Sequence, residues 1–211
     1  MTILKFENFN LSPSHRKPLS WLQTIKTILI WHGLRTHALE QTGWNKTRQS
    51  KKAVLRENPI PWWTYASIQL VDQIISTNSR ILEIGGGNSS LYWMDRGNQL
   101  VTLETYAEWI DVLANDKRFN VEKHQIIHID NEDLTSISNQ LENLVFDVVI
   151  NDGSGDRAAI GDYLATKVSE NGILIWDNSE REPDSKAIEQ LKLKGWNALE
   201  FYGLGPINAY A

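Results

Sequence analysis

Apolar runs and apolar stripes alternate along the chain from Arg80 onward. Short apolar runs that stop at polar residues predict strands, and the segments between them repeat apolar residues three and four apart, which predicts helices with one buried face. Because strand and helix alternate, we expect a parallel α/β sheet with right-handed crossovers and helices on both faces. The predicted strands cover residues 81–84, 100–103, 122–129, 146–150, 173–176 and 197–202, and a seventh begins at 206–210.

The predicted helices lie before the first strand and between the later ones. Thr64 is placed to cap a helix that runs to residue 76. Further helices are expected from residue 88 onward and over 106–116, 156–168 and 183–194. A helix around residues 134–144 is expected to turn Leu134, Ile137, Leu141 and Leu144 inward.

The N-terminal part differs from this pattern. Residues 19–31 predict an amphipathic helix whose apolar face packs on the main domain or on another subunit. The prolines within residues 58–61 force extended backbone and mark a boundary. We therefore expect a helical appendage over residues 1–58 and a main domain over residues 59–211. Trp62 is expected to fill the seam between them.

Residues 80–90, RILEIGGGNSS, predict a strand, a tight glycine turn and a helix start. Glycine adopts positive φ cheaply and lets another molecule approach the backbone, so three in succession indicate a bound nucleotide or nucleoside. A glycine-rich turn that binds nothing is the alternative. Gly85 and Gly87 fit the dinucleotide pattern G-x-G-x-x-G, but Ser90 stands at its third glycine. Glu83 would repel a diphosphate and attract an ammonium or sulfonium group.

An acid follows the next predicted strand as well. Glu104 lies about 20 residues after Gly85, where an acid can accept both ribose hydroxyls of an adenosine. Asp130, Asp152 and Asp177 follow the later strands, and the carboxyl ends of parallel strands meet at one edge of a sheet. We therefore expect these acids to converge on one ligand site.

Together these segments resemble the class I S-adenosylmethionine-dependent methyltransferases, over residues 43–210. The branch they resemble carries a P-W-x-T-Y segment upstream of the glycine motif, here residues 61–65. The resemblance implies a Rossmann-like, doubly wound, mostly parallel seven-stranded sheet and S-adenosylmethionine as cofactor. By chemistry and resemblance, the cofactor-binding residues are Thr64, Tyr65, Glu83, Gly85, Gly87, Asn88, Ser89, Ser90, Glu104, Asp130 and Asp152, and the catalytic candidates are Asp152, Asp177, Asn178 and Arg157.

A divalent metal at this site is possible, but a site without a metal is favoured. Asp152 and the pair Asp177-Asn178 stand where catechol- and caffeoyl-CoA-type O-methyltransferases bind a cation, and an oxygen-only set suits Mg²⁺ or Ca²⁺. The lysine that those enzymes keep after the fourth strand is absent, and Arg157 lies nearby, where it could neutralise the acids or recognise an anionic substrate. His124 and His128 are interpreted as ordinary packing or surface residues.

The amino-acid composition limits the chemistry, the partners and the location that the protein can have. The chain has 211 residues, 41% of them hydrophobic and 22% charged, which suits one buried core. It has no cysteine, which excludes disulfides and thiolate chemistry, and its net charge of −5 argues against nucleic acid as a partner. No apolar run approaches the ~20 residues of a membrane span, so a cytoplasmic location is expected.

The predicted function is methyl transfer from S-adenosylmethionine to a small molecule at a hydroxyl oxygen. Two alternatives stay open at this point: an NAD-dependent oxidoreductase and a non-catalytic adenosine-binding module. The nine tryptophans and the amphipathic helix leave a homodimer open.

Overall fold

The computed structural model describes residues 20–50, 54–55 and 58–206. The chain separates into two compact units at Leu39, with the second unit beginning at Glu40. Residues 40–50 and 58–59 therefore lie with the second unit. The predicted boundary between a helical appendage and a main domain at residue 58 stays a prediction.

The first unit contains helix α1 (Trp21–Gly33) and the π-helical turn η2 (Leu34–Ala38). Ser20 and Gln23 form a capping box: Ser20 Oγ accepts from Gln23 N at 3.3 Å, and Gln23 Oε1 accepts from Ser20 N at 2.8 Å. The predicted amphipathic helix is thus present, and the partner of its apolar face stays a prediction. Among the described residues, no helix is long and apolar enough to cross a membrane.

The second unit begins with two short helices, α2 (Leu39–Gln41) and α3 (Trp44–Ser50). Strands β1 (Val54–Leu55) and β2 (Asn58–Pro59) then pair in antiparallel fashion. Helix α4 (Tyr65–Ile74) follows, and Thr64 caps it as predicted, because Thr64 Oγ1 accepts from Ser67 N at 3.2 Å.

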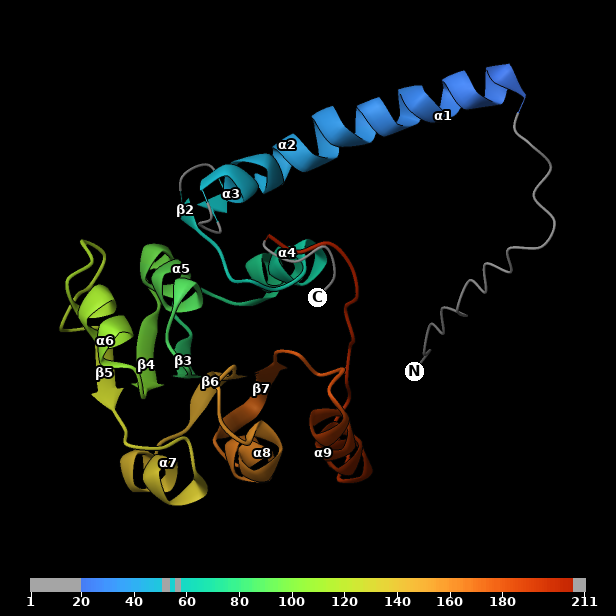
Figure 1. The fold of residues 1–211 in the computed structure, drawn as a ribbon. Coiled ribbons are helices and arrows are strands. Elements are labelled where there is room, and N and C mark those ends of the chain that lie inside the picture. Colours follow the sequence, from blue (N-terminus) through green and yellow to red (C-terminus); the bar gives the residue numbers. More distant parts are fainter. Residues whose placement is uncertain (1–19, 51–53, 56–57, 207–211) are drawn as a thin grey trace. The chain divides into compact units, whose positions relative to one another are not determined.

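A five-stranded parallel sheet forms the centre of this unit (Figure 1). Its order is β5-β4-β3-β6-β7, and every neighbouring pair is parallel. The chain order therefore reverses between β3 and β6, and open parallel sheets bind ligands in the crevice beyond the carboxyl ends of two such strands. The strands are β3 (Arg80–Ile84), β4 (Gln99–Glu104), β5 (His124–His128), β6 (Phe146–Asn151) and β7 (Val168–Trp176).

Helices cover both faces of the sheet, as the alternation predicts. Trp93 and Leu113 belong to a core between α4, α5 (Asn88–Arg96), α6 (Ala107–Ala114) and one face. Ile137 and Ile160 belong to a core between α7 (Leu134–Leu141), α8 (Arg157–Ala165) and the other face. The last helix, α9 (Glu182–Leu193), packs beside α8 and buries Leu191.

Two of the four residues expected on the inner face of α7 are exposed. Leu134 and Leu144 are 47% and 41% exposed, whereas Ile137 and Leu141 are fully buried. Leu134 is the first helical residue after its cap, and the helix ends at Leu141, where Glu142 takes a positive φ of 21°. The helical spacing therefore does not extend far enough to bring either leucine to the core.

One other expectation was wrong within the described residues. The predicted strand at 197–202 forms no ladder, and Leu199 and Tyr202 are 78% and 71% exposed. Alternating residues predict a strand only where a neighbour supplies hydrogen bonds. Trp62 is 51% exposed, its neighbour Trp63 is buried and packs against Trp93, and the contact of Trp62 with the appendage stays a prediction. The predicted seventh strand lies outside the described residues after 206.

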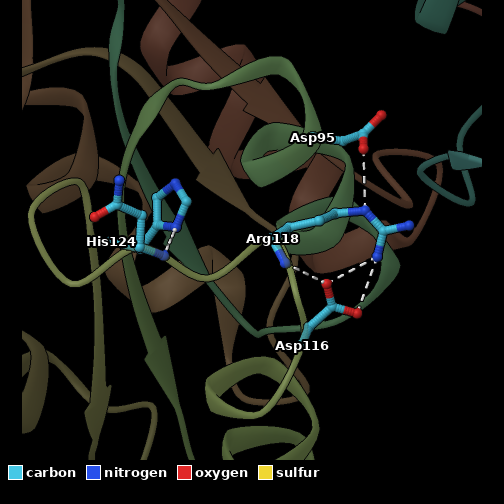
Figure 2. A network of polar contacts seen from close by, with 5 residues as sticks. Asp95, Asp116, Arg118 and His124 are labelled. Carbon is cyan, nitrogen blue, oxygen red and sulfur yellow. Dashed lines mark hydrogen bonds and ion pairs between the residues drawn. The ribbon is translucent and has the colours of Figure 1, made fainter.

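Polar contacts fix the edge of the sheet near β5 (Figure 2). Arg118 bridges α5 and the loop after α6, because its Nε contacts Asp95 at 3.0 Å and its Nη1 contacts Asp116 at 2.9 Å. His124 is buried, and its Nδ1 accepts from Asn120 N at 3.0 Å. His128 is exposed at the far end of β5. Both histidines are thus packing or surface residues, as predicted.

Candidate active site

The glycine turn and the loop after β6 meet at the crevice. Asp152 N donates to Ile84 O at 3.1 Å, and Gly85 N donates to Leu103 O at 2.9 Å. These bonds continue the sheet ladder past the strand ends. The three loops that follow β3, β4 and β6 are therefore fixed side by side.

The three glycines of the turn differ in what surrounds them. Gly85 has φ +86°, and a Cβ there would lie 2.7 Å from Asp152 O. A Cβ on Gly86 would lie 2.9 Å from the Leu113 side chain. Apart from the turn itself, no atom of the described residues lies within 4 Å of the Cβ position of Gly87. Gly85 and Gly86 are thus required by packing, whereas Gly87 leaves open space for a ligand.

Glu83 is fully buried beneath this turn. Ser90 Oγ donates to Glu83 Oε2, and Ser90 Oγ also accepts from Gly87 N at 3.0 Å. Burial raises the pKa of Glu83 from 4.5 to about 7, and hydrogen bonds from Ser89, Ser90 and Thr102 oppose this rise. Glu83 Oε1 has no hydrogen-bond partner among the described residues.

The Trp-Thr-Tyr segment lies next to the start of α5. Asn88 Nδ2 donates to Ile60 O at 3.3 Å, which joins the segment before α4 to the first residue of α5. Tyr65 N donates to Leu204 O at 3.0 Å, and burial raises the pKa of the Tyr65 hydroxyl. Ile60 therefore contacts the first residue of α5, and the placement of Thr64 and Tyr65 at the cofactor stays a prediction.

Glu104 is buried at the end of β4 and turns toward the glycine turn. Its Oε2 accepts from Gly86 N at 2.5 Å, and its Oε1 accepts from Thr105 N at 2.6 Å and Tyr106 N at 2.7 Å. The side chain thus lies where it can reach a ligand that crosses the turn.

Sequence reasoning chose Asp130 among three nearby acids, and of these Glu132 is the one that contacts the loop after β6. Asp130 is exposed. Glu132 is buried, and its Oε2 accepts from Gly155 N at 2.6 Å in the loop after β6. Burial raises the pKa of Glu132, and the charge of Glu104 raises it further. Glu132 is held there by close packing on Gly153 and Gly155, a tertiary contact that the sequence alone does not reveal.

The ends of β6 and β7 bring two carboxyl groups together. Asp152 shares a hydrogen bond with Asp177, and burial is the main cause that raises the pKa of Asp152 well above its usual range. The charges of Asp177 and Glu83 raise it further, and the charge of Arg157 lowers it. Asn178 follows with a positive φ of 49°. All three predicted residues therefore lie at one end of the crevice.

Arg157, the remaining catalytic candidate, is buried at the first position of α8. Its Nη1 donates to Asn178 Oδ1 at 3.2 Å, and its Nε lies 3.4 Å from Asp184 Oδ1. Trp176 Nε1 donates to the same Asp184 oxygen at 2.8 Å. Sequence reasoning did not single out Asp184, which read as a helix-start residue.

The arrangement does not fit a divalent metal. Among the described residues, no three or more His, Cys, Asp or Glu side chains could share an ion. Asn178 Oδ1, the amide oxygen that a cation would need, already accepts from Arg157. A dication would also lie beside a fixed guanidinium charge, which is repulsive.

Solved structures with the same fold are methyltransferases. The O-methyltransferase TomG of Streptomyces achromogenes, involved in tomaymycin synthesis and solved with S-adenosylmethionine, is 16% identical over 87% of this chain and 92% of its own, with a TM-score of 0.51. Fibrillarin of Aeropyrum pernix, solved with natively bound S-adenosyl-L-methionine, is 15% identical over 70% and 72%, with a TM-score of 0.50.

The C-terminal domain of precorrin-6Y C5,15-methyltransferase from Rhodobacter capsulatus matches similarly, at 16% identity over 73% of this chain and 83% of its own, with a TM-score of 0.50. No protein-family model and no curated protein matches the sequence. The likeness establishes the fold: this chain has the Rossmann-like fold of the class I S-adenosylmethionine-dependent methyltransferases, as predicted.

Proposed function

We propose that the protein transfers a methyl group from S-adenosylmethionine to a hydroxyl oxygen of a small molecule. The observation that carries this proposal is the buried Glu83, whose Oε1 lacks a partner among the described residues, beneath the open space at Gly87. A carboxylate there attracts the ammonium and sulfonium charges of S-adenosylmethionine and repels the diphosphate of NAD. The buried Glu83 therefore disfavours the alternative oxidoreductase.

The donor is proposed to lie across the glycine turn. Glu83 accepts from the methionine ammonium directly or through water, and Gly87 lets the methionine portion pass against the backbone. Glu104 exchanges its bond to Gly86 N for the ribose hydroxyls. Thr64 and Tyr65 close the methionine end, and the start of α5, residues 88–90, lies beneath it.

Asp130 is the proposed acceptor for the adenine amino group. Its exposed carboxylate is free to turn toward a ligand, whereas Glu132 is already bonded to Gly155 N. Asp130 therefore keeps the role that the sequence predicted, and Glu132 is proposed to hold the loop after β6 in place.

Methyl transfer is an in-line displacement in which an oxygen–carbon bond forms as the carbon–sulfur bond breaks. The sulfonium is already a good leaving group, so the protein mainly aligns the two atoms and excludes water. The hydroxyl proton passes to the carboxyl pair Asp152 and Asp177, which lies on the acceptor side of the crevice. Asn178 is proposed to orient the acceptor hydroxyl.

This proposal includes a small-molecule acceptor and a cytoplasmic location, as the sequence analysis predicts. Its test is a screen of hydroxyl-bearing acceptors with S-adenosylmethionine, in which S-adenosylhomocysteine formation is measured by mass spectrometry. Wild-type protein should form it with at least one acceptor, and Asp152→Asn should form it at least tenfold more slowly. Asp162→Asn, on the exposed side of α8, is the control. Equal rates for Asp152→Asn and wild type would contradict the proposed chemistry.

A further inference from the structure

A buried guanidinium stands at the acceptor end of the crevice. The Arg157 side chain is only 4% exposed, yet it carries a full positive charge. Burying a charge is costly unless it is paired and hydrogen-bonded. The Arg157 guanidinium meets both conditions, through Asp184 and through the amide oxygen of Asn178.

Three structural elements fix this guanidinium. Arg157 begins α8, Asp184 lies in the first turn of α9, and Trp176 ends β7. Trp176 Nε1 donates to Asp184, and the Trp176 ring packs so tightly on α8 that a Cβ at Gly161 would lie 2.3 Å from it. The guanidinium therefore has little freedom to leave Asn178.

The neighbouring ends of β6 and β7 carry oxygen atoms that a divalent cation would use. Asp152, Asp177 and Asn178 offer two carboxylates and one amide oxygen, a set that suits Mg²⁺. The guanidinium takes the amide oxygen, and its charge acts on Asp152. The positive charge of Arg157 thus already lies at the oxygen cluster of Asp152, Asp177 and Asn178.

We propose that the Arg157 guanidinium, positioned by Asp184 and Trp176, takes the place of a divalent metal at the acceptor end of the site. The inference rests on the proposed function for its catalytic meaning, because Arg157 acts on the acceptor through Asn178 and Asp152. It makes Arg157 a positioning residue, and it makes methyl transfer independent of added metal.

Mn²⁺ binding followed by electron paramagnetic resonance tests this directly. The measurement needs neither methyl donor nor acceptor, so it separates the two outcomes even where the proposed methyl transfer fails. The proteins compared are wild type, Arg157→Ala, Arg157→Lys and Asp177→Asn. Lys186→Ala, which removes an exposed cation from α9, is the matched control.

We expect wild type, Arg157→Lys and Lys186→Ala to leave the free Mn²⁺ signal unchanged up to about 1 mM, the range of the weakest protein sites for hard cations. Arg157→Ala should bind one Mn²⁺, which low millimolar guanidinium displaces. Saturable Mn²⁺ binding by wild type that Asp177→Asn abolishes would overturn the proposal. A folded Arg157→Ala protein that binds no Mn²⁺ would also overturn the proposal. If Arg157→Ala does not fold, Arg157→Gln is measured in its place.

Discussion

Ser90 Oγ donates a hydrogen bond to Glu83 and accepts one from Gly87 N, so a single hydroxyl joins the buried acid to the glycine turn. Ser90 stands where the dinucleotide pattern has its third glycine. The residue that breaks that pattern is therefore the one that fixes Glu83.

Ser90→Ala should weaken S-adenosylhomocysteine binding about tenfold. The change leaves Gly87 N without its acceptor and removes a donor from Glu83, and a buried group left unpaired costs about 1–3 kcal/mol. Isothermal titration calorimetry measures the affinity. Ser138→Ala, which removes a hydroxyl from α7, serves as the control. Unchanged affinity in Ser90→Ala would show that the turn does not depend on this bond.

The ionisation of Glu83 should make the stability of the protein depend on pH. Its pKa rises from 4.5 to about 7 on folding, so below pH 4.5 the side chain is protonated in both states. As pH rises from 4.5 to 7, the unfolded chain releases the proton first, and the folded state loses about 3 kcal/mol relative to it.

Glu83→Gln should remove this part of the pH dependence. Urea unfolding at pH 5 and pH 8 measures it, and wild type should lose about 2–3 kcal/mol more than Glu83→Gln between the two values. Because the charge of Glu83 also raises the pKa of Asp152, the difference between the two proteins reports Glu83 together with its effect on Asp152. Identical losses in the two proteins would mean that Glu83 is ionised in the folded state throughout.

Gly85→Ala should lower the stability of the protein, whereas Gly87→Ala should lower its affinity for the cofactor. Alanine at Gly85 meets a positive φ and the Asp152 carbonyl, so the free energy of unfolding should fall by about 2 kcal/mol or more. Alanine at Gly87 meets no atom, so stability should hold while cofactor affinity falls at least tenfold. Thermal melting and calorimetry separate the two. Full affinity in Gly87→Ala would place the ligand elsewhere.

Asp184→Ala should destabilise the protein by about 3 kcal/mol, because it leaves the buried Arg157 charge without its carboxylate. Asp162→Ala is the matched control, since it breaks an exposed pair with Lys194 and should cost less than about 0.5 kcal/mol. Chemical denaturation measures both. Equal small losses would show that Arg157 does not depend on Asp184.

The central fold was predictable because local signals coincide there. The run before Gly85 is apolar, the glycines mark the turn, and Glu104 follows the next apolar run. The strands, the turn and their succession along the chain can therefore be predicted without tertiary information. Glu83, Asp152 and Asp177 lie near one another because parallel strands point the same way.

The remaining features depend on contacts between distant segments. Asp130 and Glu132 have similar local surroundings, and only the packing of the loop after β6 buries Glu132 while Asp130 stays exposed. Asp184 reads as a helix-start residue until Arg157 and Trp176 are placed around it. The alternation at residues 197–202 looks like a strand, but a strand needs a neighbour that a local pattern does not reveal.

Calorimetric titration with S-adenosylmethionine, S-adenosylhomocysteine and NAD⁺ tests the central claim most directly, on wild type, Glu104→Ala and the surface control Glu108→Ala. We predict micromolar binding of both sulfur nucleosides to wild type and Glu108→Ala, its loss in Glu104→Ala, and no binding of NAD⁺. Binding of NAD⁺ alone, or of none of the three, would contradict the assignment of this site to S-adenosylmethionine.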